Sequence, residues 1–152
     1  HLSLRRQRQM CIRDRYKISH DQNETDIQFI GNSNKLVQVF DNLVDNSLSI
    51  IGKNCKIIIR VFSKGKKIFI LFEDNGPGFP KNAINKIFDR FYTDRINQKE
   101  FGNHSGLGLS ISKQIISAHN GEIFAENIIN NNKKITGARV NIILNKQIFS
   151  NL

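Results

Sequence analysis

Residues 32–51, NSNKLVQVFDNLVDNSLSII, decide the fold of this chain. Apolar residues recur in this stretch at steps of three and four, which is the period of a helix with one face in a core. These residues are Leu36, Phe40, Leu43, Val44, Leu48 and Ile51. Asn32 or Ser33 can cap the first turn with a side-chain oxygen. The pattern predicts a long amphipathic helix that ends near Ile51 and packs its apolar stripe on the rest of the domain.

Opposite that stripe, the same helix carries an unusual row of amides. Gln38, Asn42 and Asn46 are four residues apart, so their side chains stack on one face of the predicted helix. A solvated polar face is the usual reason for such spacing. The motifs that follow in the chain favour a functional interpretation of this row of amides.

Short β-branched runs flank this helix. Residues 56–62 and 67–72 are separated by a four-residue linker with a glycine, which predicts a hairpin. Residues 123–128 and 138–144 predict a second antiparallel pair near the end of the chain. Ahead of the helix, the alternation in residues 27–30 predicts a short strand that stops at a glycine.

Two further helices are predicted after the hairpin. Residues 107–118 are amphipathic and end before an Asn-Gly pair at 120–121, where either residue can take the left-handed conformation. A shorter helix ends near Phe88, and residues 93–105 are polar and without a period, as in a mobile loop. The order of elements predicts an α/β two-layer sandwich, with a mixed β-sheet and the helices packed on one face.

Two glycine motifs could approach a ligand. Asp74-Asn75-Gly76-Pro77-Gly78 follows a predicted strand, and there a carboxylate could accept a hydrogen bond from an amino group. Taken alone, this motif is better explained as a turn. Gly106 and Gly108 open a predicted helix, where free N–H groups and the helix dipole favour a phosphate. The chain has neither a P-loop nor a Rossmann glycine motif, so a phosphate site would belong to another architecture.

Together, four blocks resemble the motifs of the histidine-kinase branch of the Bergerat ATPases, the GHKL group that includes DNA gyrase. QVFDNLVDN (38–46) is similar to the N box, and DNGPGF (74–79) to the first glycine box. IFDRFYTD (87–94) is similar to the aromatic box, and SGLGLSISKQIISAHNG (105–121) to the second glycine box. The resemblance covers residues 27–144 and implies the Bergerat fold and an ATP-binding catalytic (HATPase) domain. FYTDR and HSGLGLSISKQI are also similar to a subgroup of membrane-bound envelope-sensing kinases.

The resemblance implies roles for the polar residues and glycines of the first two blocks. Asn46, together with Asn42, would hold the Mg²⁺ that bridges the phosphates of ATP, since amide oxygens suit this hard ion. Asp74 would bind the amino group of adenine. Gly76 and Gly78 would shape the pocket for the base.

The second glycine box would contact the phosphates, and the aromatic box would anchor a lid. The resemblance places the phosphates against the segment Gly106, Leu107, Gly108 and Leu109. Phe88 and Phe91 would anchor the lid formed by residues 93–105. Packing in the core explains the two phenylalanines equally well.

Two positions bear on the type of reaction. Gln38 stands where the ATP-hydrolysing relatives carry a glutamate that activates water, and an amide cannot accept that proton. This favours transfer of the γ-phosphoryl group to a protein acceptor over hydrolysis. After the second asparagine, kinases of this type often have Ala, Lys and Tyr, whereas this chain has Ser47-Leu48-Ser49-Ile50. The phosphate-contacting lysine is therefore missing, and Arg95 or Lys99 could supply the charge instead.

The resemblance also implies partners. The phosphoacceptor histidine would lie on the protein's own dimerisation domain, and a response regulator receiver domain would take the phosphoryl group next. The parent protein would be a membrane-bound homodimer, with this domain on the cytoplasmic side of the inner membrane. His20 is too close to the N box for a dimerisation hairpin, and His119 is expected to end a helix. The acceptor is therefore expected upstream of this chain.

Length and charge set further limits. The 152 residues suit one domain, which is predicted to span residues 16–152, and no run is apolar enough for a membrane helix. Of the net charge of +10, residues 1–15 contribute +4 through five arginines and one aspartate, so no nucleic-acid partner is expected. This opening segment has no period, and its RQMCIRDR string is similar to translated sequencing-adaptor sequence. It is predicted to be non-native or disordered, with a basic interdomain linker as the alternative.

Two other functions stay open from the sequence. A stand-alone kinase of the same fold would phosphorylate serine on an anti-sigma-factor antagonist, and the aromatic box argues against it. A domain with a decayed site would sense nucleotide or act as a scaffold. Against decay, the expected ligand-binding residues are all present, namely Asn42, Asn46, Asp74, Gly106 and Gly108.

Overall fold

The computed structural model describes residues 16–20 through their backbone, and residues 27–90, 92 and 107–146 in full. Several predicted features lie outside these residues: the opening segment 1–15, the loop 93–105 with Arg95 and Lys99, Phe91 and Gly106. None of the helices in the described part is long and apolar enough to cross a membrane.

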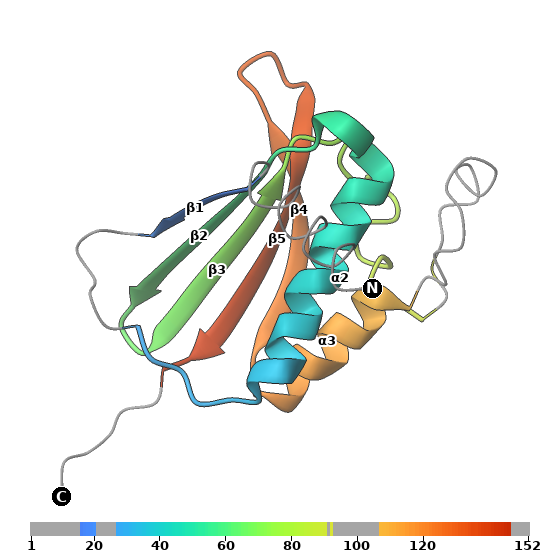
Figure 1. Cartoon of the computed structure of the whole chain (residues 1–152). Coiled ribbons are helices and arrows are strands. Elements are labelled where there is room, and N and C mark those ends of the chain that lie inside the picture. The colour runs from blue at the N-terminus through green and yellow to red at the C-terminus, as the bar shows by residue number, and fades with distance from the viewer. Residues whose placement is uncertain (1–15, 21–26, 91, 93–106, 147–152) are drawn as a thin grey trace, which may run out of the picture.

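The described residues form one sheet with two helices on one of its faces (Figure 1). The strand order is β1-β2-β3-β5-β4; β1 runs parallel to β2, and the other neighbours are antiparallel. The predicted two-layer α/β sandwich with a mixed sheet is thus confirmed. The elements are β1 (Tyr16–His20), α2 (Ser33–Ile51), the 3₁₀ turn η1 (Gly52–Asn54), β2 (Ile57–Lys64), β3 (Lys67–Asp74), α3 (Gly108–Ala118), β4 (Glu122–Ile129) and β5 (Ile135–Asn145).

Both predicted hairpins are confirmed. β2 and β3 are joined by two residues, of which Gly65 has a positive φ of 61°, as a tight turn with glycine first requires. β3 extends two residues beyond its predicted end, which places Asp74 as its last residue. β5 likewise starts at Ile135 rather than at residue 138.

The strand predicted at residues 27–30 is wrong. This segment has no strand partner, although Ile27 and Phe29 pack against the core while Ile30 is exposed. The alternating sequence pattern of residues 27–30 therefore reflects burial of every second side chain. It does not reflect hydrogen bonding to a neighbouring strand. The strand in this part of the chain is β1, which pairs with β2 and was not predicted.

The short helix predicted to end near Phe88 is also wrong. The chain forms consecutive turns here, with the amides of Ala83, Lys86 and Asp89 each donating to the carbonyl three residues earlier. Asn82 and Asn85 favour turns over a continuous helix, because their side chains compete for backbone groups. Phe88 is nevertheless buried in the core by this arrangement.

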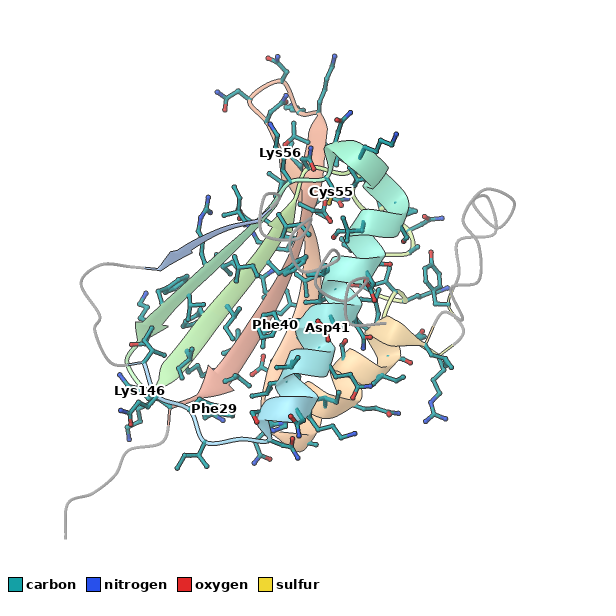
Figure 2. All side chains as sticks on the ribbon, in the orientation of Figure 1. Phe29, Phe40, Asp41, Cys55, Lys56 and Lys146 are labelled. Carbon is teal, nitrogen blue, oxygen red and sulfur yellow. The ribbon has the colours of Figure 1, made fainter. Side chains whose placement is uncertain are left out.

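The apolar stripe of α2 faces the sheet as predicted. Leu43 is buried, and the other predicted members are partly buried against the core; Phe40 can be followed in Figure 2. Val39, which the prediction omitted, is fully buried. Ser47 lies on the same buried line, eight residues after Val39, and is only 2% exposed. A polar side chain in that position requires a hydrogen-bond partner, which is described below.

The far end of α3 is joined to the start of α2 through His119. Its Nδ1–H donates to the Ile115 carbonyl at 2.7 Å, and its Nε2 accepts from the backbone N–H of Asn32 at 3.0 Å. The Asn32 side chain in turn caps α2 by accepting from the amide of Lys35. The two helices are therefore fixed to each other at this end of the layer.

Asn120 ends α3 in the left-handed conformation, with φ of 55°. The Gly121 amide donates to the Ile116 carbonyl and the Asn120 amide to the Ser117 carbonyl, each at 2.9 Å. These two bonds define a Schellman motif and confirm the predicted helix end.

We expect Asn120→Ala to lower the free energy of unfolding by about 1 kcal/mol, because alanine lacks the short polar side chain that lets asparagine tolerate the left-handed backbone. Asn120→Gly should leave stability unchanged or slightly raised, since glycine adopts positive φ freely. Urea unfolding of both variants, beside the exposed Ser117→Ala as a control, measures the difference. Equal losses in the two Asn120 variants would contradict a backbone origin.

Candidate functional site

The Asp74 carboxylate is held by three different parts of the fold. Its Oδ1 accepts from the backbone amides of Gly76 at 2.9 Å and Ala138 at 3.2 Å. Its Oδ2 accepts from the Ser47 hydroxyl on α2 at 2.6 Å. The β3–β5 ladder has its last pair at Glu73 and Arg139, so the Asp74 side chain continues the ladder where the backbone pairing stops. The carboxylate is thus fixed relative to the sheet, the following loop and the helix layer.

The neighbouring residue, Glu73, anchors the same strand end from the opposite face of the sheet. It is 6% exposed and forms ion pairs with Arg60 at 3.1 Å and Arg139 at 2.7 Å. Successive residues of a strand point to opposite faces, so this network lies away from the helices. Its contribution is to hold β3 and β5 together just before Asp74.

The loop after Asp74 owes its glycines to packing within the chain. A Cβ on Gly76 would come within 2.9 Å of the Ile51 side chain. Gly78 has φ of 76°, and its Cβ would come within 2.5 Å of the Asn127 Oδ1. Asn127 needs that space because its side chain accepts from the Phe79 N–H and donates to the Phe79 carbonyl, both at 2.7 Å. This two-way contact ties the loop to β4, and no local sequence pattern predicts it.

Asn42 connects the middle of α2 to the first turn of α3. Its Nδ2 donates to the Gly108 carbonyl at 3.1 Å and to the Ser112 hydroxyl at 3.4 Å. Because the nitrogen is committed to α3, the Asn42 Oδ1 is left as an acceptor. One turn further along α2, Asn46 is partly buried, and its side chain makes no hydrogen bond to any described residue.

Gly108 differs from the loop glycines, since nothing in the described structure requires a glycine there. Its φ is not positive, and a Cβ would lie 3.7 Å from Asn42, which is an ordinary contact. Packing among the described residues therefore does not explain the absence of a side chain at the start of α3. Close approach of a ligand to the backbone would give a physical reason for it.

The other predicted site residues lie at a helix end, in or against the core, or on α2. Leu107 is the N-cap residue of α3, and the side chain of Leu109 packs against the core. Phe88 is a buried core residue, in agreement with the packing alternative for this position. Gln38 is partly buried on α2, one turn before Asn42.

The oxygens of Asn42 and Asn46 fit a Mg²⁺ ion that takes most of its ligands from elsewhere. No cluster of three or more His, Cys, Asp or Glu side chains occurs among the residues described. Mg²⁺ commonly keeps several waters and is shared with substrate phosphates rather than enclosed by protein carboxylates. The donor set suits a metal brought in with a nucleotide.

A two-layer sandwich with this amide row, this carboxylate and this glycine-led helix defines an ATP-binding domain of the class that the motifs resemble. The chain belongs to the family described as histidine kinase-, DNA gyrase B- and HSP90-like ATPase, whose model matches residues 31–148.

Sensor kinases are among the curated relatives. The chain is 43% identical over 106 residues to the sensor protein ChvG of Rhizobium meliloti (strain 1021), covering 69% of this chain and 18% of ChvG. It is 33% identical over 139 residues to the sensor histidine kinase WalK of Bacillus subtilis (strain 168), covering 82% and 22%. The chain thus spans about a fifth of the length of these relatives.

Solved structures agree on the fold. A mycobacterial sensor histidine kinase, MprB, superposes with a TM-score of 0.73 at 23% identity, over 93% of this chain and 92% of that one. The catalytic domain of histidine kinase ThkA gives a TM-score of 0.70 at 26% identity, over 91% and 86%.

We expect Gly78→Ala to destabilise the domain by about 2 kcal/mol, because the new Cβ meets Asn127 and the backbone has a positive φ. Gly108→Ala should leave stability unchanged or raise it by up to about 1 kcal/mol, since alanine favours the helix and finds ordinary contacts. Denaturant unfolding of both variants in the absence of nucleotide tests the distinction. A comparable loss in Gly108→Ala would mean that packing, not a ligand, requires that glycine.

Proposed function

We propose that this chain is the ATP-binding catalytic domain of a two-component sensor histidine kinase. It transfers the γ-phosphoryl group of Mg-ATP to a histidine on a dimerisation domain outside this chain. The observation that carries the proposal is the bridging role of α2, where Asn42 contacts the start of α3 and Ser47 contacts Asp74. These positions are five residues apart, about 7.5 Å along a helix axis. The two ends of one nucleotide can therefore be bound along a single helix.

In this proposal each end of the nucleotide has its own residues. Asp74 accepts a hydrogen bond from the adenine amino group, beside a loop shaped by Gly76 and Gly78. Asn46 and Asn42 offer oxygens to Mg²⁺, and the start of α3 from Gly106 to Leu109 offers backbone amides to the phosphates. Catalysis then rests on positioning and charge neutralisation, which supply most of the rate in phosphoryl transfer.

The partners and location are part of the same proposal. Histidine kinase ThkA, whose catalytic domain shares this fold, has been solved in complex with the response regulator TrrA. By analogy, the phosphoryl group would pass from the histidine to a response regulator receiver domain. The parent would be a membrane-bound homodimer with this domain in the cytoplasm. Support comes from the relatives, which are sensor proteins about four times as long as this chain.

Transfer of label from γ-labelled ATP separates the three candidate functions. This chain alone should bind ATP and take up no label, whereas a longer product of the same gene that includes the acceptor should form acid-labile, base-stable phosphohistidine. Acid-stable label on a serine of an added protein would favour the stand-alone kinase instead. Binding of ATP with no transfer by the longer product would favour the nucleotide-sensing domain, and phosphohistidine on His119 of the short chain would contradict the proposal.

Two substitutions should separate the base end from the metal end. Asp74→Asn places an amide donor opposite the adenine amino group, so it should weaken adenosine, ATP and Mg-ATP alike, by about 1 to 3 kcal/mol. Asn46→Asp adds negative charge beside the triphosphate, so it should weaken ATP more without metal than with it and barely affect adenosine.

Calorimetric titration with the three ligands measures these effects. Asp41→Asn is the matched control, because Asp41 lies on the exposed side of α2 next to Asn42 (Figure 2). It should bind all three ligands as the unmodified chain does. If Asn46→Asp weakened adenosine as much as Asp74→Asn, the assignment of the two ends would be wrong.

A further inference from the structure

Ser47 is a polar residue in a position that the helix pattern reserves for an apolar one. It lies on the buried line of α2 with Val39 and Leu43 and is 2% exposed. A buried hydroxyl is costly unless it is hydrogen-bonded, so its presence in this chain calls for a physical reason.

The buried Ser47 hydroxyl has a hydrogen-bond partner in Asp74. The Ser47 hydroxyl donates to Oδ2 at 2.6 Å, while Oδ1 already accepts from two backbone amides. An ionised carboxylate has about four lone-pair positions, two on each oxygen. Both positions of Oδ1 are therefore used, and one position of Oδ2 has no donor among the described residues. Ser47 thus donates to the oxygen that can still accept a further hydrogen bond.

We propose that Ser47 is a positioning residue that fixes Asp74 as a pure acceptor and thereby makes the site selective for 6-aminopurines over 6-oxopurines. The inference rests on the proposed function and deepens it. Three donors hold the carboxylate in one orientation, and its remaining lone pair can act only as an acceptor. An amino group on the base completes this set, whereas a carbonyl oxygen in the same place would bring two acceptors together.

A merely structural role for Ser47 predicts a different outcome. Alanine at this position would remove one hydroxyl from the interior, and any general loosening would weaken all nucleotides to the same degree. Loss of the positioning bond would instead weaken only those ligands that carry the 6-amino group. The decisive quantity is therefore the ratio of two affinities and not the affinity for ATP alone.

The test compares Mg-complexed ATP, purine riboside triphosphate and inosine triphosphate, which carry an amino group, a hydrogen and an oxo group at position 6. Calorimetry on the unmodified chain should rank ATP first and the inosine nucleotide last. Ser47→Ala should weaken ATP about five- to tenfold and leave purine riboside triphosphate within about twofold, so that the preference between them shrinks. Ser49→Ala is the control, because Ser49 lies on the same helix and donates to the Asn46 carbonyl rather than to Asp74.

The failures of the two proposals can be told apart. If the unmodified chain binds none of the three nucleotides, the proposed function fails and this inference with it. If it binds and prefers ATP but Ser47→Ala weakens all three equally, or changes none, the inference alone is overturned. If it binds ATP without preference over purine riboside triphosphate, Asp74 does not read the amino group and Ser47 cannot tune that contact.

Discussion

The Asp74 carboxylate is the point at which the separate parts of this domain meet. Its two oxygens accept hydrogen bonds from the loop that follows β3, from β5 and from α2. A partly buried carboxylate is stable only when such donors surround it, and bonds to an ionised group are stronger than bonds between neutral ones. The position of α2 over the sheet is therefore coupled to the position of the loop. Because the amide row belongs to α2, the proposed metal end of the site depends on the same carboxylate that is proposed to read the base.

The register of α2 then determines which side chains face the sheet and which face the proposed nucleotide site. Asn46 and Ser47 are adjacent in sequence but differ by about 100° around the helix, so Ser47 is buried while Asn46 is only partly buried, as its proposed role requires. A rotation of the helix by one residue would exchange these roles. Two hydrogen-bonded contacts with α3 oppose such a rotation: His119 holds the amide of Asn32 at the start of α2, and Asn42 holds the carbonyl of Gly108 near its middle.

The sequence predicts those parts of the structure that have a local period. Both long helices, both hairpins and the layer arrangement follow from spacing and turn residues, and the motifs indicate Asn42, Asp74 and Gly108 as candidate site residues. β1 is not predicted, because its edge pairing leaves little pattern in five residues, and residues 27–30 alternate without pairing. The contacts of Ser47 with Asp74 and of Asn127 with Phe79 span 27 and 48 residues, so no local rule reveals them. A serine on the apolar stripe of α2 was the one available signal.

The glycines of the candidate site are of two kinds, those with close packing contacts and those without. Only the second kind is good evidence for nucleotide binding. A Cβ on Gly76 would crowd Ile51, and a Cβ on Gly78 would crowd Asn127, so both glycines have a packing role whether or not a ligand is bound. Their presence is therefore evidence for the fold and only weak evidence for nucleotide binding. Gly108 and the free side chain of Asn46 have no such structural demand among the described residues, and the open lone pair of Asp74 has none either. If the site had decayed, substitutions at Asn46 and Gly108 would have cost the fold little. The presence of these two residues near the open lone pair of Asp74 is thus the stronger argument for the proposed nucleotide site.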